Sequence, residues 1–167
     1  MILENNDLLF AKVKPNAIIP SKDDENAGYD IYCCAEEDII IKPHETKLIP
    51  TGIACAMSEG YYMQLFERGS TGSKGIKESC GVIDSSFRNE IFAAIYNAND
   101  FEIIITDKTD KVENLKGNKI LLYPKSKAIC QGVILPVPKM NIKEVSYEEL
   151  LKYESKRGLG QLGSSGK

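Results

Sequence analysis

Short apolar runs, rich in Ile, Val, Tyr and Phe and separated by turn residues, recur along most of this chain. Such runs are typical of β-strands, because β-branched and aromatic side chains pack well on a pleated surface. The predicted strands cover 8–14, 28–34, 38–42, 46–56, 61–67, 90–97, 101–106, 119–123 and 128–137. Since no helical stretch separates them, the pattern predicts an all-β fold, either a barrel or a jelly-roll sandwich.

Two polar breaks in this pattern are predicted to be hairpin connections. The first is KPHE at 42–45, where Pro43 fixes φ between two apolar runs. The second is the long polar stretch over 98–126, which we interpret as a hairpin with its tip near 107–118.

Near the C-terminus the pattern changes from strand to helix and then to a flexible tail. Ser146 stands three residues before Glu149, which predicts a capping box at the start of a helix over 146–153. The last 14 residues hold four glycines and three serines and cannot form a packed element alone. We therefore predict one β domain over 1–153 and a flexible tail over 154–167.

Composition limits the classes of function. A length of 167 residues with 43% hydrophobic and 27% charged residues fits one globular domain. The N-terminus lacks the pattern of a signal peptide and no apolar run is long enough to span a membrane, so a soluble, cytoplasmic protein without membrane contact is expected. The net charge of -3 argues against a nucleic-acid partner but leaves room for a small anion held by a few local cations.

The histidine and cysteine content excludes several kinds of metal site. His44 is the one histidine, and its position in a turn favours a solvated loop residue. The five cysteines are odd in number and have no C-x-x-C spacing, which favours buried thiols in a reducing cytosol over disulfides or a zinc ribbon. Carboxylates are then the expected bases of any acid–base chemistry.

The basic residues are 18 lysines and three arginines, and each arginine lies beside a stretch rich in Gly, Ser or Asp. Arginine presents a planar fork of donors that suits bidentate contact with phosphate. The positions of Arg68, Arg88 and Arg157 therefore indicate oxyanion binding, although chance explains three residues equally well.

Three segments could carry chemistry. RGSTGSKG at 68–75 combines close backbone approach with hydroxyl donors, in a register that is not a Walker A loop; a plain surface turn is the alternative. GVIDSSFRNEI places Asp84 at the end of a predicted buried strand as a candidate base for water, and Phe87 as a flat wall for a sugar or base; an Asp-initiated turn is the alternative. Asp30, in AGYDIYCC, is an inward-facing acid that needs a cation or a metal-bound water as partner.

Taken in order, five segments resemble the motifs of the homotrimeric dUTPase family. AGYDIY is similar to the first motif, ERGSTG to the second, GVIDSSFRNEI to the third, AICQGVILPV to the fourth and RGLGQLGSSG to the glycine-rich fifth. The resemblance runs from about residue 10 to the C-terminus, and its third and fifth motifs are the most specific.

The resemblance implies an all-β jelly-roll or β-clip barrel that forms a homotrimer with shared active sites. It also implies Mg²⁺-assisted hydrolysis of dUTP to dUMP and pyrophosphate, with Asp84 activating the water that attacks the α-phosphate. Asp30 would contact Mg²⁺ through water, and Phe87 would lie under the deoxyribose and leave no space for a 2′-hydroxyl. The other implied substrate contacts are Arg68, Gly69, Ser70, Gly81, Ile83 and Gln131, with Arg157, Gly160, Leu162, Gly163, Ser164 and Ser165 in a tail that closes over a neighbour's nucleotide.

The sequence departs from the family pattern in four places. Leu162 stands where the family usually has a Phe that stacks on uracil, and Asn89 replaces a Gly that Asn can mimic at positive φ. The stretch SKGIKES at 73–79 is one residue short, close to where uracil would be read, and 98–126 is longer than a minimal member needs, as in some phage-type members.

Three other functions remain open on the sequence. A related dCTP deaminase shares the fold, but the second motif here lacks that group's extended arginine pattern. A regulatory protein would use the 98–126 insertion to bind a protein partner. A purely structural jelly-roll module would bind no nucleotide.

Overall fold

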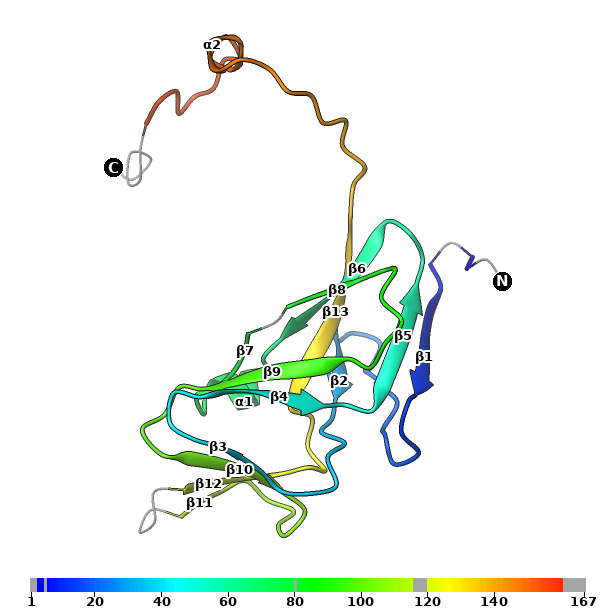
Figure 1. The fold of residues 1–167 in the computed structure, drawn as a ribbon, viewed down its shortest axis with the longest axis vertical. Coiled ribbons are helices and arrows are strands. Elements are labelled where there is room, and N and C mark those ends of the chain that lie inside the picture. The colour runs from blue at the N-terminus through cyan, green and yellow to red at the C-terminus, as the bar shows by residue number, and fades with distance from the viewer. Residues whose placement is uncertain (1–2, 5, 80, 116–119, 161–167) are drawn as a thin grey trace.

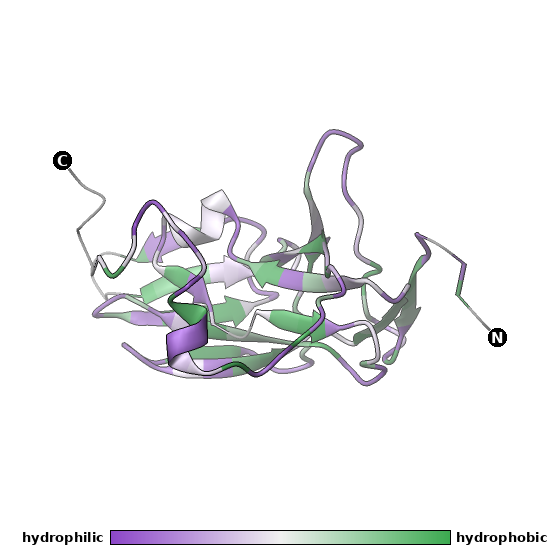
Figure 2. Cartoon of the chain, turned by 90° about the horizontal axis from the view of Figure 1, so that it is seen from above, coloured by the Kyte–Doolittle hydropathy of each residue, from purple (hydrophilic) through white to green (hydrophobic). Residues whose placement is uncertain are grey.

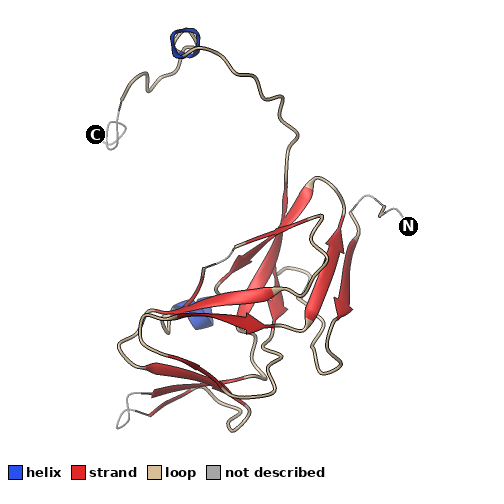
Figure 3. Ribbon diagram, viewed as in Figure 1, coloured by secondary structure: helices blue, strands red, loops and turns tan. Residues whose placement is uncertain are grey.

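Strand pairing organises this chain into four small sheets with very little helix. The computed structural model describes residues 3–4, 6–79, 81–115 and 120–160. Within them it forms thirteen strands and two four-residue helices (Figure 3). The elements are β1 (Leu8–Lys12), β2 (Gly28–Ile31), β3 (Ile39–Ile41), β4 (Thr46–Pro50), β5 (Ile53–Met57), β6 (Tyr61–Phe66), α1 (Gly69–Gly72), β7 (Ile76–Glu78), β8 (Val82–Asp84), β9 (Phe92–Asn97), β10 (Glu102–Thr106), β11 (Glu113–Leu115), β12 (Ile120–Pro124), β13 (Cys130–Pro136) and α2 (Tyr147–Leu150). The predicted all-β class is confirmed.

Most of the strand pairs join strands that are not consecutive in sequence (Figure 1). Their strand orders are β1-β5, β11-β12-β10-β3, β2-β13-β6-β8 and β4-β9-β7. Between the sheets lies one core of aliphatic side chains, in which Ile31, Ile49, Ile103 and Met63 are fully buried. Hydrophobic residues concentrate on the strands and hydrophilic residues on the loops (Figure 2), as burial of apolar surface requires.

The predicted single strand over 46–56 is wrong, because Thr51 and Gly52 divide it into β4 and β5. Gly52 has φ +67°, a left-handed conformation that glycine adopts without strain. Its N–H donates to the Glu90 carboxylate at 2.9 Å, which holds the turn in place. The chain thereby passes from the β4-β9-β7 sheet to the β1-β5 sheet.

Neither polar break forms the hairpin that the sequence predicted. The KPHE turn exists, with the Glu45 N–H donating to the Lys42 carbonyl at 3.1 Å, but β3 pairs with β10 while β4 pairs with β9. In the 98–126 segment, β10 and β12 are parallel neighbours, and β11 pairs antiparallel with β12. The insertion therefore extends a sheet at the β3 side of the fold instead of projecting as one long hairpin.

After β13 the chain leaves the sheets as an exposed arm. All residues from Pro136 to Gly160 are exposed, and the arm carries α2 at its far end (Figure 1). Ser146 caps α2 as predicted, accepting from the Glu149 N–H at 3.1 Å, although the helix ends at Leu150 rather than residue 153. Leu150 at the end of α2 and the following Leu151 are exposed and cover no part of this chain's own core. The predicted domain boundary at residue 153 stays a prediction.

Candidate active site

Strand register brings the predicted phosphate-binding residues together at one end of the β2-β13-β6-β8 sheet. Asp30 on β2 lies opposite Gln131 on β13, and Gln131 lies opposite Phe66, the last residue of β6. Gly28 makes this approach possible, since a Cβ there would lie 2.3 Å from the Gln131 side-chain oxygen. Arg68 lies two residues after the end of β6. Asp30, Gln131 and Arg68 therefore lie close together, at or just beyond three neighbouring strands.

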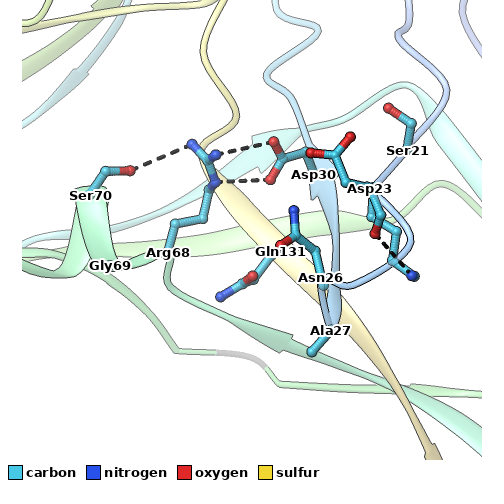
Figure 4. A pocket seen from close by; sticks show the side chains of 11 residues that line it. Ser21, Asp23, Asn26, Ala27, Asp30, Arg68, Gly69, Ser70 and Gln131 are labelled. Carbon is cyan, nitrogen blue, oxygen red and sulfur yellow. Dashed lines mark hydrogen bonds and ion pairs between the residues drawn. The ribbon is translucent and has the colours of Figure 1, made fainter.

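Asp30 and Arg68 form a two-point ion pair. The Nε of Arg68 lies 2.9 Å from Oδ1 of Asp30, and its Nη2 donates to Oδ2 at 3.1 Å (Figure 4). Both side chains are 31% exposed, so the pair is reachable from solvent yet less screened than a surface pair. The sequence predicted that Asp30 needs a cation or a metal-bound water as its partner. In the structure this partner is the Arg68 guanidinium.

The turn after Arg68 is a short helix that the sequence did not predict. α1 begins after Arg68, whose backbone N–H donates to the Thr71 hydroxyl at 2.9 Å. This turn places the Ser70 hydroxyl 3.5 Å from Nη1 of Arg68. Thr71 is buried, so the turn is anchored while Gly69 and Ser70 remain exposed.

These residues line a cavity of about 530 Å³, which we call the nucleotide pocket after the ligand that the family resemblance implies for it. Gln131 is held on its wall by donating from Nε2 to the Glu67 carbonyl at 3.0 Å. The opposite wall is the loop over 21–27, which the sequence reasoning missed. Its residues Lys22 and Asp23 also line the pocket. The run of charges immediately before AGYD was the available signal.

A metal ion would find carboxylates here but no complete set of protein ligands. Asp23 and Asp30 line the same pocket, and among the described residues no three His, Cys, Asp or Glu side chains cluster closely enough to hold a metal. This donor set fits Mg²⁺, which keeps several waters and takes one or two carboxylates together with substrate phosphates.

Asp84 and Phe87 lie on a separate tight turn. Asp84 ends β8, and the Phe87 N–H donates to its carbonyl at 3.0 Å. Arg88 closes the turn by donating from Nη1 to the carbonyls of Ser85 and, at 2.8 Å, Phe87. Within one chain Asp84 is exposed, and β8 is an edge strand rather than the buried strand that the sequence predicted.

Gly81 and Ile83, which the sequence also predicted as substrate contacts, are held in place by β6. The Gly81 carbonyl accepts from the Leu65 N–H at 2.7 Å, and a Cβ at Gly81 would collide with the Gln64 side chain. Ile83 lies opposite Met63 and packs against the core.

The turn that carries Asp84 lies far from the nucleotide pocket of the same chain. In the sheet order β2-β13-β6-β8, Asp30 and Asp84 occupy strands at opposite edges. Along β6, Asp84 is aligned with Tyr62 whereas Gln131 is aligned with Phe66, a separation of about 13 Å at the usual rise of a strand. One chain alone therefore does not bring the predicted base to the predicted phosphate contacts.

The described part of the predicted tail lies on the exposed arm. Arg157 donates from Nε to the Gly160 carbonyl at 3.2 Å, and neither residue approaches the nucleotide pocket of its own chain. Leu162, Gly163, Ser164 and Ser165 lie outside the described residues.

His44 and the cysteines stand apart from both groups. Nε2 of His44 lies 2.9 Å from Asp100 in an exposed turn, so the prediction of a solvated loop histidine is confirmed. Cys33, Cys34, Cys55 and Cys130 are free and buried, as predicted, and burial raises the pKa of each thiol. Cys80 lies outside the described residues. In the part of the chain that the structure describes, no helix has the length and apolar character needed to cross a membrane.

The family model and the curated relatives that match this chain all belong to one family, the dUTPases. The dUTPase family model matches residues 14–115. A deoxyuridine 5′-triphosphate nucleotidohydrolase of Nautilia profundicola is 34% identical over 164 residues, covering 96% of this chain and 99% of that protein. The protein of the same name in Helicobacter pylori is 30% identical over 159 residues, 93% of each chain.

Solved structures agree. A mutant dUTPase of Staphylococcus bacteriophage 80alpha with dUpNHpp superposes with a TM-score of 0.76 at 27% identity, covering 98% of this chain and 100% of that one. A mutant dUTPase of phage phi11 of S. aureus, described with a structural Mg(II) ion, shares the fold with a TM-score of 0.68 at 24% identity, covering 90% of this chain and 100% of that one.

Proposed function

The chain belongs to the dUTPase family, and we propose that it is a dUTP diphosphatase whose active sites are each assembled from more than one copy of the chain. The reaction converts dUTP to dUMP and pyrophosphate, which limits uracil in DNA and supplies dUMP for dTMP synthesis. The observation that carries the shared-site proposal is the separation of Asp84 from the nucleotide pocket within one chain. A homotrimer removes that separation by placing the Asp84 turn of one subunit against the pocket of the next.

Asp84 is the general base of the proposed reaction. An ionised carboxylate accepts the proton of a water that attacks the α-phosphate and so makes that water a stronger nucleophile. The tight turn closed by the Phe87 N–H and the Arg88 guanidinium fixes the direction of Asp84 relative to the Phe87 ring. Phe87 is 38% exposed, which leaves a flat apolar surface for deoxyribose. Gly81 and Ile83 place this turn by pairing with β6.

Arg68, Ser70 and Gln131 bind the triphosphate in this proposal, with backbone N–H groups near Gly69 as further donors. Fixed donors that point at developing negative charge stabilise a phosphoryl-transfer transition state without reorganisation. The Asp30–Arg68 pair keeps the guanidinium in place before substrate arrives. Phosphate then competes with Asp30 for the same fork of donors.

Mg²⁺ is the proposed cofactor, and Asp30 would hold it through water beside the bound phosphates. When bound, it neutralises charge on the triphosphate and polarises the reacting phosphate. Asp23 lines the same pocket and adds a second carboxylate that can accept from a water of the Mg²⁺ shell.

Exposed apolar surface supports assembly into a trimer. Leu48 on β4, Val82 on β8 and Phe92 on β9 are 63%, 60% and 40% exposed. The arm adds further exposed large apolar side chains, namely Val137, Met140, Ile142, Val145, Tyr147, Leu150, Leu151, Tyr153 and Leu159. Apolar surface of this extent on one chain marks a protein–protein interface. The arm ends in the tail with Arg157 and Gly160, which in this proposal closes over a neighbouring subunit's nucleotide, with Leu162, Gly163, Ser164 and Ser165 in contact with it.

Complementation between inactive variants tests the shared site. Asp84→Asn and Arg68→Ala chains are co-expressed with different tags, and mixed trimers are purified on both tags. Each homotrimer should be inactive, whereas about one site in three of every mixed trimer combines two intact partners. Recovery of activity supports a site built from two chains. Absence of recovery in mixed trimers of the correct mass would place both residues in one chain's site and overturn the proposal.

A substrate panel tests the reaction itself. Pyrophosphate release is measured from dUTP, dTTP, dCTP and UTP with Mg²⁺, and dUTP should be strongly preferred. Equal rates on all four nucleotides, or ammonia release from dCTP, would contradict a dUTP diphosphatase. The cytoplasm is the proposed location, which the free buried thiols support. A protein partner on the 98–126 insertion stays a prediction.

A further inference from the structure

A second cavity, of about 430 Å³, lies on the other side of the Asp30–Arg68 pair. It shares Asp30, Arg68 and Ser70 with the nucleotide pocket. Its remaining lining includes Lys74 from the turn after α1, Val112 from the 98–126 insertion, and Ser126 and Lys127 from the turn between β12 and β13. We call this cavity the insertion pocket, because Val112 and Ser126 of the 98–126 insertion line it. No residue of the insertion lines the nucleotide pocket.

The two pockets differ in charge. In the nucleotide pocket Lys22 and Arg68 are balanced by Asp23 and Asp30. In the insertion pocket Lys74, Lys127 and Arg68 face a single carboxylate, that of Asp30, which Arg68 already neutralises. The insertion pocket therefore has a net positive lining and attracts small anions.

The hydrogen-bond donors that line this pocket differ in whether they already have a partner within the chain. Nζ of Lys74 donates to the Ser70 carbonyl at 2.7 Å, and Arg68 is held by Asp30. For the Lys127 ammonium and the Ser126 hydroxyl, no hydrogen bond or ion pair is made with any residue that the structure describes. Two adjacent residues of one turn thus present uncommitted donors to the cavity.

Hydrogen bonds of the buried Lys125 hold the insertion, and thus its part of the pocket wall, against the rest of the chain. Lys125 is 6% exposed, and its ammonium donates to Asp107 at 2.8 Å and to the carbonyls of Ala35 at 2.8 Å and Glu36 at 3.1 Å. Because every donor of this buried cation is satisfied, Lys125 near the end of the insertion is tied to Asp107 and to the segment between β2 and β3. Val112 packs against the core and so occupies a fixed place in the pocket wall.

We propose that the insertion pocket binds a free phosphate anion, inorganic phosphate or pyrophosphate, with Lys127 and Ser126 as its principal donors. The proposal rests on the cavity, its charge and its free donors, and it holds whether or not the nucleotide pocket binds dUTP. Two sources share this chemistry: pyrophosphate released in the adjoining pocket, and inorganic phosphate from solution.

Calorimetric titration of pyrophosphate and, separately, of inorganic phosphate into the full chain tests this. Each titration uses the wild type, Lys127→Gln and the matched control Lys111→Gln, a change of another exposed lysine of the same chain region that lines neither pocket. Lys127→Gln should weaken binding roughly fivefold, the scale of one exposed ion pair, and Lys111→Gln should not. Preference for pyrophosphate would point to the reaction product, and equal affinity to phosphate from solution.

Repeating the titrations with protein saturated by dUpNHpp separates the two pockets. Binding that persists, and that Lys127→Gln still weakens, supports the proposal. Binding that vanishes with the analogue, or that Lys127→Gln leaves unchanged, would overturn it, because the anion would then occupy only the nucleotide pocket. Failure of the dUTP assay would leave the difference between the wild type and Lys127→Gln unchanged, so the two proposals fail separately.

A second pair of variants protects the test against misfolding. Val112→Asp places a negative charge in the pocket wall, and Val112→Asn introduces the same shape without charge. Only Val112→Asp should weaken pyrophosphate binding beyond any shared effect. Equal affinity of the two variants would show that charge in this pocket is irrelevant and would also overturn the proposal.

Discussion

Asp30 and Arg68 engage each other through two roughly parallel contacts, Nε to Oδ1 at 2.9 Å and Nη2 to Oδ2 at 3.1 Å. This geometry matches the fork of a guanidinium to the two oxygens of a carboxylate. The residue proposed to bind phosphate and the residue proposed to receive a magnesium-bound water therefore hold each other. Substrate with its metal ion offers each of them a replacement partner of the correct charge.

Arg68→Lys should lower kcat/KM for dUTP by roughly 10- to 100-fold, because lysine keeps the charge but cannot make the two-point contact. The loss should appear mainly as a higher KM. Steady-state kinetics across dUTP concentrations measures it, with thermal unfolding to verify folding. Asp30→Asn serves as the comparison, since it should instead raise the Mg²⁺ concentration needed for half-maximal activity. Wild-type kinetics in Arg68→Lys would show that the two-point contact of Arg68 plays no part in phosphate binding.

Asp84→Asn should reduce kcat by about 10²- to 10⁴-fold, the usual contribution of a general base. Binding of dUpNHpp should change less than about threefold, because the amide keeps the size of the carboxylate. Single-turnover kinetics and calorimetry measure the two quantities. Asp100→Asn is the matched control: Asp100 is an exposed carboxylate near His44 and distant from both groups of site residues. Retained turnover in Asp84→Asn would assign the base to another residue.

The local chemistry of the site could be predicted from the sequence, whereas the partnerships within it could not. AGYD, ERGSTG and AICQG each identified a residue that the structure brings to the nucleotide pocket. The Asp30–Arg68 pair depends on the register of β2 against β13 and of β13 against β6, which no local pattern encodes. Asp23 was missed because the loop before β2 shows no periodicity.

The errors in the fold have the same physical origin. Gly52 divides a continuous apolar run, and one positive φ is enough to send its two halves into different sheets. The parallel pairing of β10 with β12 requires a crossover between the two strands, whereas the polar sequence near 107–118 resembles the tip of a hairpin. Hydrophobic alternation predicts that a strand forms, but its partner is chosen by packing between distant segments.

Phe87→Ala should lower the preference for dUTP over UTP by roughly tenfold, because removing the ring opens space for a 2′-hydroxyl. The ratio of kcat/KM for the two nucleotides measures this. Phe87→Tyr is the matched control, since it retains the ring that lies beside the deoxyribose and should retain the preference. An unchanged ratio in Phe87→Ala would show that another wall excludes the ribonucleotide.

Leu162→Phe should strengthen nucleotide binding by about 1 kcal/mol, the scale of an aromatic pair, if the tail closes over uracil as the family resemblance implies. The gain is measured as a lower Kd for dUpNHpp. Leu162→Met, which keeps the side chain aliphatic and similar in size, should show no gain. Equal affinities for Phe and Met would mean that residue 162 does not contact the base.

Cys130 should make folding stability fall as pH rises above about 8.5, the ordinary pKa of a thiol in an unfolded chain. Burial raises its pKa in the folded protein, where the residue is fully buried in β13. Below the unfolded pKa both states keep the proton and stability is unaffected. Above it the unfolded chain loses the proton while the folded chain keeps it, so unfolding becomes more favourable until the folded pKa is reached.

Urea unfolding under reducing conditions at pH 7.5, 8.5 and 9.5 measures this effect against Cys130→Ala. The alanine variant loses core packing equally at every pH, so only the slope of its free energy of unfolding against pH is informative. The wild type should lose stability more steeply than Cys130→Ala above pH 8.5, by at most about 1.4 kcal/mol per pH unit for one proton. Parallel slopes would show that the Cys130 thiol ionises as easily in the folded protein as in the unfolded chain.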